Sequence, residues 1–237
     1  MISKNLLKTL CSDAGIVLDE TALERFDTYA ELLVYWNERI NLTAITEPDE
    51  IVYKHFLDSL ILLKYVDFSE NAKVIDVGTG AGFPGLALLI AKPSLAITLM
   101  DSTKKKLTVI EDILQKLNLS ANLVHMRAEE AGKLPDFREQ YDIATARAVT
   151  NLRDLSEICL PFVKVDGFFT PLKGAGAKEE LMCAKKAIQV LGGTVTGAEF
   201  FSLPNCGDRA VIYVKKISQT LPKYPRPSAQ IAKKPIL

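Results

Sequence analysis

The sequence lacks the features that mark several common classes of protein. Its four cysteines are far apart and form no C-x-x-C pair, so they give no signal of a metal site and fit a reducing cytosol. No apolar run reaches the ~20 residues that a membrane-spanning helix needs. The opening stretch MISKNLLKTLCSD has no apolar segment of the kind that a signal peptide carries. We therefore expect a cytoplasmic protein with neither a metal nor a membrane partner.

Acidic residues are absent from the last part of the chain, although the whole sequence has a formal net charge of zero. Residues 209–237 hold seven basic residues and no acidic one, whereas residues 1–72 hold six basic and thirteen acidic residues. Such an asymmetry can mark a polyanion as partner. The alternative is that the basic end packs against the acidic start, and the charges alone do not separate the two.

The first part of the chain predicts helices. Apolar residues such as Leu23, Phe26 and Leu33 recur at three- and four-residue steps, which gives a buried stripe along a helix. Pro48 and the acidic residues after it favour the start of another helix. With 237 residues and 48% hydrophobic composition, the chain can build a full core around this segment.

From Lys73 onward strand and helix patterns alternate, which predicts an α/β fold with a mostly parallel sheet and right-handed crossovers. We expect a closing hairpin with its turn at 205–208 to add an antiparallel strand at one edge. The domain interpretation is a helical extension at 1–70, an α/β domain at 71–217 and an irregular, basic, proline-containing arm at 218–237. The expected strands are 73–77, 95–101, 122–126, 141–148 and 166–174, and the expected helices are 84–92, 102–119 (capped by Ser102), 152–163 and 177–191.

The stretch VIDVGTGAGFPG, residues 74–85, allows two interpretations. Starting at Gly80 it is a formal G-x-G-x-x-G with Asp101 about twenty residues on, as in dinucleotide-binding folds. Starting at Asp76 it is D-x-G-x-G-x-G, the loop of S-adenosylmethionine enzymes. An NAD-dependent oxidoreductase and a methyltransferase are therefore both candidates. A non-catalytic RNA-binding protein with a relic loop is a third.

The end of the preceding strand favours S-adenosylmethionine. The apolar strand ends at Val77, so Gly78 is the first turn residue and the main chain near Gly80 can approach a ligand closely. Asp76 would repel a pyrophosphate but can attract the ammonium of a methionyl group, directly or through water. Asp101 suits a ribose diol in either case. An oxidoreductase would also need a catalytic Tyr–Lys, His or Cys system downstream, and the sequence offers no convincing one.

Together with this loop, motifs along nearly the full chain resemble the RsmG (GidB) family of bacterial methyltransferases that act on small-subunit ribosomal RNA. GAGFPG with HFLDSL upstream is the most specific combination. The tail differs at Ser228–Ala229, where the family more often has Gly–Thr. The matching motifs are NLTAI (41–45), HFLDSL (55–60), DVGTGAGFPGLAL (76–88), DS-x-x-K (101–105), RAE (127–129), ARAV (146–149), PLKG (171–174) and YPR…KKP (224–235).

The resemblance implies a class I S-adenosylmethionine-dependent methyltransferase: a Rossmann-like, seven-stranded sheet of order 3-2-1-4-5-7-6 with a helical N-terminal extension. It also implies methyl transfer from S-adenosylmethionine to N7 of a guanine in 16S rRNA. The partner is then 16S rRNA or the small ribosomal subunit, and we expect a monomer. Cofactor contacts are implied at Gly78, Phe83, Ala128, Glu129 and Arg147.

The chemistry of N7 limits the catalytic residues that we expect. N7 carries a lone pair and no proton, so the task is alignment and no general base is needed. Arg147 follows the fourth expected strand, where it can hold the guanine O6, a phosphate or the methionyl carboxylate, or else form a salt bridge with an acid such as Asp76. We expect His55 to be a hydrogen-bonded structural histidine or a wall of the cofactor pocket, and His125 to lie in the core. Candidate RNA contacts are Lys173, Arg209, Arg226, Lys233 and Lys234.

Overall fold

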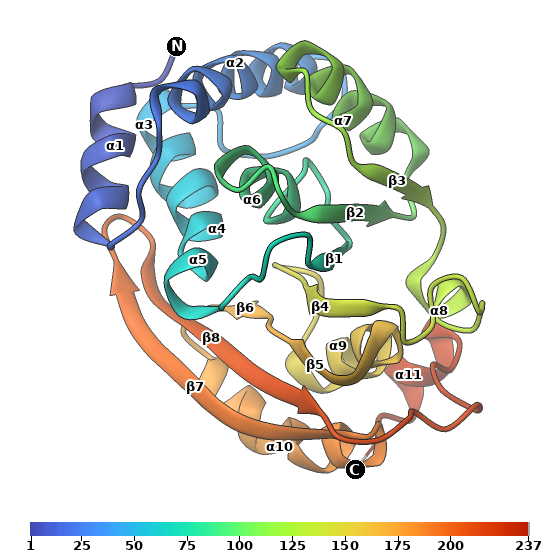
Figure 1. The fold of residues 1–237 in the computed structure, drawn as a ribbon. Coiled ribbons are helices and arrows are strands. Elements are labelled where there is room, and N and C mark those ends of the chain that lie inside the picture. The colour runs from blue at the N-terminus through green and yellow to red at the C-terminus, as the bar shows by residue number, and fades with distance from the viewer. Residues whose placement is uncertain (237) are drawn as a thin grey trace.

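The computed structural model describes residues 1–236, which build an eight-stranded sheet with helices on both faces (Figure 1). The alternating strand and helix patterns of the sequence are therefore confirmed. The strands are β1 (Lys73–Val77), β2 (Ala96–Asp101), β3 (Asn122–His125), β4 (Tyr141–Thr145), β5 (Val163–Phe169), β6 (Leu172–Lys173), β7 (Gly193–Leu203) and β8 (Gly207–Lys216).

The order of the strands is β3-β2-β1-β4-β5-β8-β6, and β7 pairs with the other side of β8. Strands β1 to β5 pair in parallel, whereas β8 runs antiparallel to β5, β6 and β7. The expected seven-stranded sheet needs one correction, because β6 is an eighth strand. The chain leaves β5 at Thr170–Pro171 and then pairs again with β8 through Leu172 and Lys173. The seven longer strands keep the order that the resemblance implies.

The N-terminal segment is helical, as the apolar stripe predicts. Leu23, Phe26 and Leu33 are fully or almost fully buried. This segment shares one hydrophobic cluster with α6 and α7 on the same face of the sheet. The helices concerned are α1 (Lys4–Asp13), α2 (Glu20–Asn37), α3 (Pro48–Ile51), the π-helical η1 (Val52–Leu57), α4 (Asp58–Leu60), α5 (Leu62–Tyr65), α6 (Gly85–Ala91) and α7 (Lys104–Leu117).

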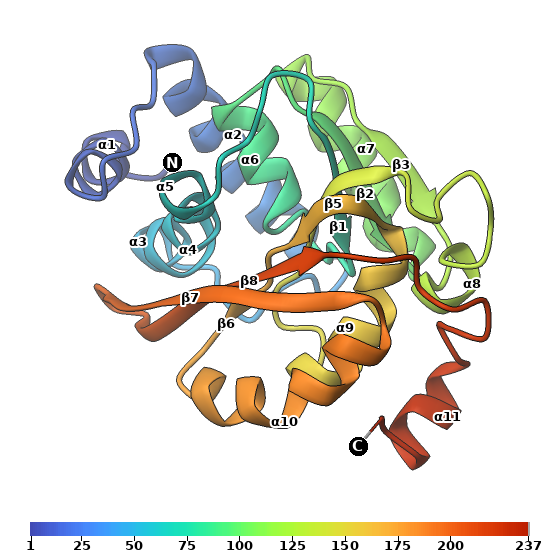
Figure 2. The same ribbon diagram turned by 60° about the horizontal axis from the view of Figure 1, so that its bottom comes forward.

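A second hydrophobic cluster fills the opposite face of the sheet. Figure 2 shows α9 and α10 on one side of β8 and α6 on the other. Because β1 to β5 are parallel, their carboxyl ends lie together at one end of the sheet. Ligands bind at that end in folds of this kind. The remaining helices are α8 (Ala128–Ala131), α9 (Leu152–Cys159), the 3₁₀ turn η2 (Leu160–Phe162), α10 (Ala177–Val190) and α11 (Ser228–Lys233).

Three local expectations were wrong. Thr103, not Ser102, is the N-cap of α7, because Asp101 Oδ1 accepts a hydrogen bond from Thr103 N and places the helix start one residue later. His125 is exposed, since β3 is an edge strand and this side chain lies outside the core. The expected irregular arm contains helix α11, whose Ile231 is buried.

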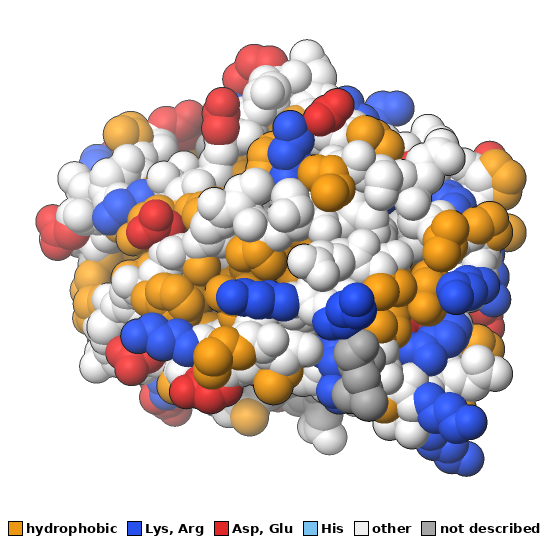
Figure 3. All heavy atoms as spheres, turned by 90° about the horizontal axis from the view of Figure 1, so that it is seen from below, with side chains coloured by type: hydrophobic (Ala, Val, Ile, Leu, Met, Phe, Trp, Pro, Cys, Tyr) orange, Lys and Arg blue, Asp and Glu red, His pale blue; other side chains and the backbone are white. Residues whose placement is uncertain are grey.

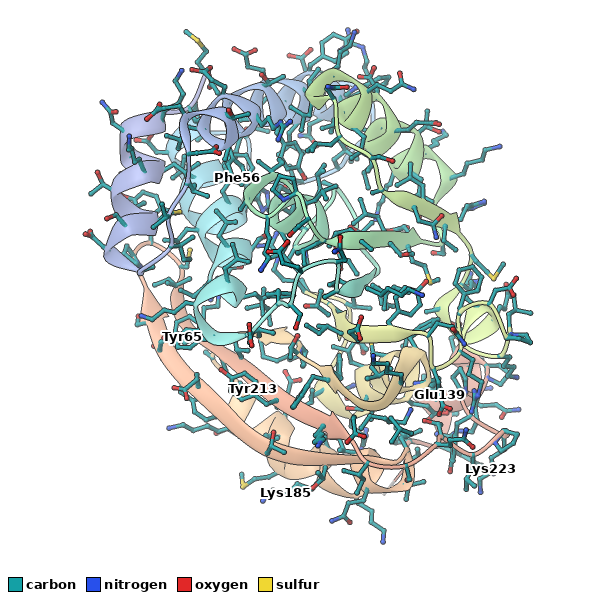
Figure 4. The ribbon with its side chains drawn as sticks, in the orientation of Figure 1. Phe56, Tyr65, Glu139, Lys185, Tyr213 and Lys223 are labelled. Carbon is teal, nitrogen blue, oxygen red and sulfur yellow. The ribbon has the colours of Figure 1, made fainter. Side chains whose placement is uncertain are left out.

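Helix α11 of the basic C-terminal end packs against α9, whereas Arg209 of the same basic end forms an ion pair with Asp58 of the acidic N-terminal segment. Arg226 forms an ion pair with the buried Glu157, with Nη2 2.5 Å from Oε2. Arg138 donates to the carbonyl oxygens of Thr220 and Tyr224. Figure 4 shows Glu139 beside this segment, where its Oε1 accepts from Thr220 N and lies 3.2 Å from Lys216 Nζ. The last residues of the basic end are therefore held by α9 and by Arg138 and Glu139, and its first residue, Arg209, meets the N-terminal segment at Asp58.

Candidate cofactor site and substrate pocket

The glycine loop joins β1 to α6 at the carboxyl edge of the sheet. Gly78, Gly80 and Gly82 have φ values of +75°, +61° and +107°, a region that side chains other than glycine rarely adopt. The amides of Gly78 and Thr79 both donate to Met100 O, which fixes the loop against β2. A Cβ on Gly80 would have a single neighbour within 4 Å, Gly78 O at 4.0 Å, whereas a Cβ on Gly78 would lie 2.8 Å from Val149 Cγ2. The main chain of this loop is therefore open to close approach by a ligand.

Asp76 lies under the loop and is fully buried. Its Oδ2 accepts hydrogen bonds from Thr79 Oγ1 at 2.6 Å and from Gly85 N at 2.8 Å, and its Oδ1 has no partner in residues 1–236. Burial raises the pKa of Asp76 to about 6, although the Thr79 and Gly85 hydrogen bonds oppose the rise. A buried acceptor without a donor calls for a ligand or water at that position. The atom suits an ammonium group, as the sequence predicts.

Asp101 is the last residue of β2, and its carboxylate binds the same glycine loop. Its Oδ2 accepts from Gly80 N at 3.0 Å and its Oδ1 from Thr103 N at 2.8 Å. Lys106 Nζ lies 3.8 Å from Oδ2. Each carboxylate oxygen has a second lone pair, so the residue can still accept from a diol.

Ala128 and Glu129 begin α8, directly after β3. Because β3 pairs in parallel with β2, these two residues follow a strand that ends at the same edge as Asp101. Both are partly buried. The structure therefore brings the predicted cofactor residues of β1, β2 and β3 to one edge of the sheet.

Arg147 follows β4 and reaches toward the N-terminal helical segment. Its Nη1 donates to Asp58 Oδ2 at 2.8 Å and to Lys54 O at 3.0 Å. Its guanidinium carbon lies 5.0 Å from the centre of the Phe83 ring. The salt bridge that the sequence left open therefore exists, but its acid is Asp58 and not Asp76.

His55 supports this arginine as a neutral side chain. Its ring stacks on Phe83 with centroids 4.5 Å apart, and its Nδ1 lies 3.2 Å from Arg147 Nη2. Arginine can only donate, so Nδ1 accepts and Nε2 carries the proton toward Thr43 Oγ1, 2.8 Å away. Burial, followed by the charge of Arg147, lowers the pKa of His55 to about 3. These contacts agree with the structural role expected for His55.

His55 lies in the π-helical η1. Such turns are rare and frequent at functional sites. The neighbouring Phe56, labelled in Figure 4, packs against Phe26 and Phe83 and ties η1 to both α2 and the glycine loop.

A pocket of about 420 Å³ opens beside Arg147. Asp58 lies in its wall and holds two arginines, because its Oδ1 also accepts from Arg209 Nε at 2.7 Å. Ala148, in the same wall, has a φ of +56°, a strained value of the kind that collects at functional sites. The further side chains around the pocket are those of Ile45, Lys54, His55, Leu172, Lys173 and Glu180.

Sequence reasoning did not single out Asp58 or Glu180. Asp58 is the one acid within HFLDSL, and an acid in an otherwise apolar helix was a usable signal. Glu180 lies among other charged residues of α10, and nothing in that stretch distinguishes it.

Comparison with known proteins identifies the family. The family model GidB, rRNA small subunit methyltransferase G, matches residues 22–211. The ribosomal RNA small subunit methyltransferase G of Alkaliphilus metalliredigens is 45% identical over 238 residues and covers 100% of both chains. That of Bacillus subtilis is 46% identical over 227 residues, which is 95% of each chain. The chain belongs to the rRNA small subunit methyltransferase G family.

Solved structures agree with the fold of an rRNA small subunit methyltransferase G. A SAM-dependent O-methyltransferase from Thermotoga maritima aligns with a TM-score of 0.56 at 15% identity, over 80% of this chain and 73% of its own. TrmN from Thermus thermophilus aligns with a TM-score of 0.54 at 19% identity, over 68% of this chain and 48% of its own. The class I methyltransferase fold is therefore confirmed, and S-adenosylmethionine is the cofactor of the family.

As a member of the methyltransferase G family, the chain has residues that fit S-adenosylmethionine. The unpaired Oδ1 of Asp76 calls for a donor, and the methionyl ammonium supplies one. The space at Gly80 admits a ligand against the main chain. The interpretation as an NAD-dependent oxidoreductase is not favoured. Within residues 1–236 no helix is long and apolar enough to cross a membrane, and His, Cys, Asp and Glu form no group of three or more that could hold a metal ion.

The residues predicted to contact RNA lie in two regions. Lys173 and Arg209 line the pocket beside Arg147. Lys233 and Lys234 are exposed at the end of α11. Arg226 anchors the same end of the chain, because its Nη1 donates to Lys234 O at 2.7 Å while its Nε and Nη2 bind Glu157. Figure 3 shows Lys and Arg side chains gathered on the face that carries the C-terminal segment.

Proposed function

We propose that this protein transfers the methyl group of S-adenosylmethionine to N7 of a guanine in 16S rRNA. The observation that carries the proposal is the pocket beside the glycine loop, where Arg147 and Arg209 are held by one carboxylate. Arginine donors suit O6 of guanine and the phosphates of RNA. The pocket offers no basic imidazole, because His55 is held neutral. This combination suits an acceptor atom that has no proton to lose.

The cofactor supplies an electrophilic methyl group on a sulfonium centre. The residues of the chain have to bind and orient the molecule. Asp76 Oδ1 would take the ammonium, Asp101 would take the ribose diol, and Ala128 and Glu129 at the start of α8 would hold the adenine end. Phe83, whose ring stacks on the pocket residue His55, would separate the cofactor from the pocket.

Arg147 positions the base. Its Nη1 is engaged with Asp58 and Lys54, and its Nη2 donates one hydrogen toward His55. The Nε hydrogen and the second Nη2 hydrogen remain for the base or for the methionyl carboxylate. A guanidinium that is fixed by four acceptors, the carbonyl oxygen of His55 included, is preorganised, so little freedom is lost when the substrate binds. We therefore assign the catalytic role to Arg147.

The RNA is held outside the pocket by charge. Lys173 and Arg209 line the pocket, and the exposed Lys233 and Lys234 extend the basic surface toward the C-terminus, with Arg226 as their anchor. We propose that the protein acts in the cytoplasm as a monomer, without a metal. The division into a helical extension at 1–70, a methyltransferase domain at 71–217 and a basic arm at 218–237 belongs to the same proposal.

Methyl transfer to RNA from a strain that lacks the gene tests the proposal. Tritiated S-adenosylmethionine and total RNA are incubated with the protein, and the labelled nucleosides are separated. We expect label in 7-methylguanosine from 16S rRNA. Label in another nucleoside would refute the guanine-N7 assignment, and no label in RNA would support a non-catalytic RNA-binding protein instead.

A further inference from the structure

Glu180 lines the pocket, but the proposed function assigns no role to its carboxylate. It lies in the first turn of α10 and lines the same pocket as Arg147. Its Oε2 accepts a hydrogen bond from Leu152 N at 2.6 Å and forms an ion pair with Lys173 Nζ, 2.7 Å away. Its Oε1 takes part in no hydrogen bond with residues 1–236, and the side chain is 30% exposed. One oxygen is therefore anchored and the other is left for a ligand.

The anchoring gives this carboxylate a fixed position. Leu152 begins α9, Lys173 forms β6 and Glu180 belongs to α10, so three elements meet at Oε2. Lys173 Nζ also donates to Thr150 O at 2.8 Å, which ties the loop after Arg147 to the same point. A carboxylate held in this way is preorganised for recognition.

Glu180 also differs in kind from the other charged groups of the pocket. Lys54, Arg147, Lys173 and Arg209 can only donate hydrogen bonds. Asp58 can only accept, but both of its oxygens are engaged by the two arginines. Oε1 of Glu180 is therefore the carboxylate oxygen of the pocket that, within residues 1–236, accepts no hydrogen bond from the protein.

A purine presents its donors and acceptors in a pattern that this arrangement can read. Guanine has the acceptors N7 and O6 next to one another, and the donors N1–H and N2–H₂ follow on the adjoining edge. Adenine has an amino group in place of O6 and no donor at N1 or C2. A pocket of arginine donors with one free carboxylate oxygen therefore matches guanine and mismatches adenine.

We propose that Glu180 is a specificity-determining residue, whose Oε1 accepts from N1–H and N2–H₂ of the target guanine while N7 faces the methyl donor. The inference rests on the proposed function and extends it to a base-reading contact. With adenine in the pocket, Oε1 would face a ring nitrogen lone pair and the arginine donors an amino group. A site built to hydrogen-bond a substrate rejects analogues that lack the partner groups, because its own polar groups are left unpaired.

Inosine provides the test, because it keeps O6, N7 and N1–H and lacks only the N2 amino group. The target position is mapped with the wild-type enzyme, and 16S rRNA with guanosine or inosine at that position is prepared by ligation. Single-turnover rates at saturating cofactor are then compared. For the wild-type enzyme we expect inosine to be methylated about ten- to a hundredfold more slowly, which corresponds to one hydrogen bond to a charged group.

The variants separate base reading from a structural role. For Glu180→Ala we expect the ratio of the methylation rates of guanosine and inosine to fall to about one. For Glu180→Gln we expect this ratio to fall below that of the wild type. Each ratio is measured within one preparation, so a smaller folded fraction cancels. Glu179→Ala changes the neighbouring exposed acid of α10 and should keep the wild-type ratio.

The outcomes distinguish the inference from the proposed function. A wild-type enzyme that forms 7-methylguanosine without discriminating against inosine would overturn the inference alone. The same conclusion follows if Glu180→Ala keeps the full wild-type ratio. If the wild-type enzyme forms no 7-methylguanosine, the proposed function fails first.

Discussion

Asp58 and Arg147 form a partly buried ion pair between residues 89 positions apart in the sequence, with Arg147 Nη1 2.8 Å from Asp58 Oδ2. The other oxygen of Asp58 lies 2.7 Å from Arg209 Nε. One carboxylate thus connects the N-terminal helical segment with the ends of β4 and β8. The helical segment therefore does more than cover the sheet, because it positions the side chain to which we assign catalysis.

Arg147→Lys should retain part of the activity, since it keeps the charge and loses the planar fork. Arg147→Ala should lose about 10²-fold or more, because alignment is lost. It should also lower the free energy of unfolding by about 1–3 kcal/mol, because Asp58 is left with one partner. Single-turnover rates and urea unfolding measure the two effects. Arg39→Ala, at an exposed site, is the control, and near wild-type rates for Arg147→Ala would refute the assignment.

The pH–rate profile should show no enzyme group acting as a catalytic base. N7 has no proton to lose, and the pKa of His55 is lowered to about 3 by burial and by Arg147. Single-turnover rates with saturating cofactor should therefore be flat between about pH 6.5 and pH 8.5. A rate that follows the ionisation of His55 or Glu129 would move the chemistry to that group.

Gly78→Ala should weaken binding of S-adenosylmethionine because the new Cβ would lie 2.8 Å from Val149 Cγ2, so the loop proposed to hold the cofactor would have to shift. Part of any effect comes from backbone strain at the positive φ. Gly15 has a φ of +81° and open space around it, so Gly15→Ala measures the strain alone. Calorimetric titration should show a loss of affinity only for the Gly78 variant. Equal affinities would mean that the loop does not contact the cofactor.

Cofactor affinity should rise with pH up to about 6 and then level off. The pKa of Asp76 in the free protein is raised to about 6 by burial, so below that pH the carboxyl is protonated. Binding the ammonium favours the ionised form, so affinity falls up to about tenfold for each pH unit below the pKa. Asp76→Asn should bind more weakly and without this pH dependence. A wild-type affinity that stays constant from pH 5 to 7 would contradict the contact.

The same raised pKa has a consequence for stability in the absence of cofactor. The ordinary pKa of 3.8 lies below the folded value of about 6, so the unfolded chain binds fewer protons between these values. The contribution of Asp76 to stability therefore falls as pH rises from 3.8 to about 6. Comparing urea unfolding of the wild type and Asp76→Asn across this range isolates that slope.

RNA affinity should fall steeply with salt, and Lys233→Gln with Lys234→Gln should flatten the slope by up to about two units. Both lysines are exposed, and the segment that carries them packs against α9. Lys4→Gln with Lys8→Gln is a matched control on α1, where both lysines face glutamates. Filter binding across a salt series gives the slopes. An unchanged slope in the tail variant would remove these lysines from the RNA contact.

The sequence by itself determined the glycine loop and the type of fold. A loop of this kind depends on neighbouring residues, because an apolar strand must end at Val77 and glycines must follow at positions with positive φ. The alternation of strands and helices after Lys73 is likewise a local pattern. Such local signals can be recognised without knowledge of the rest of the chain. They also predict that Asp76, Asp101 and Arg147 lie at strand ends.

Only the tertiary structure decided which charges meet. Asp58 binds Arg209 across 151 positions, and Glu180 caps the start of α9 at Leu152 from a separate helix. No spacing in the sequence encodes these pairs, since they depend on strand order and on how η1 lies over the end of β4. The same holds for Arg226, whose charge suggests RNA while its contacts anchor the tail at Glu157. The charge of a residue can be read from the sequence, but the partner of that charge depends on how the chain packs.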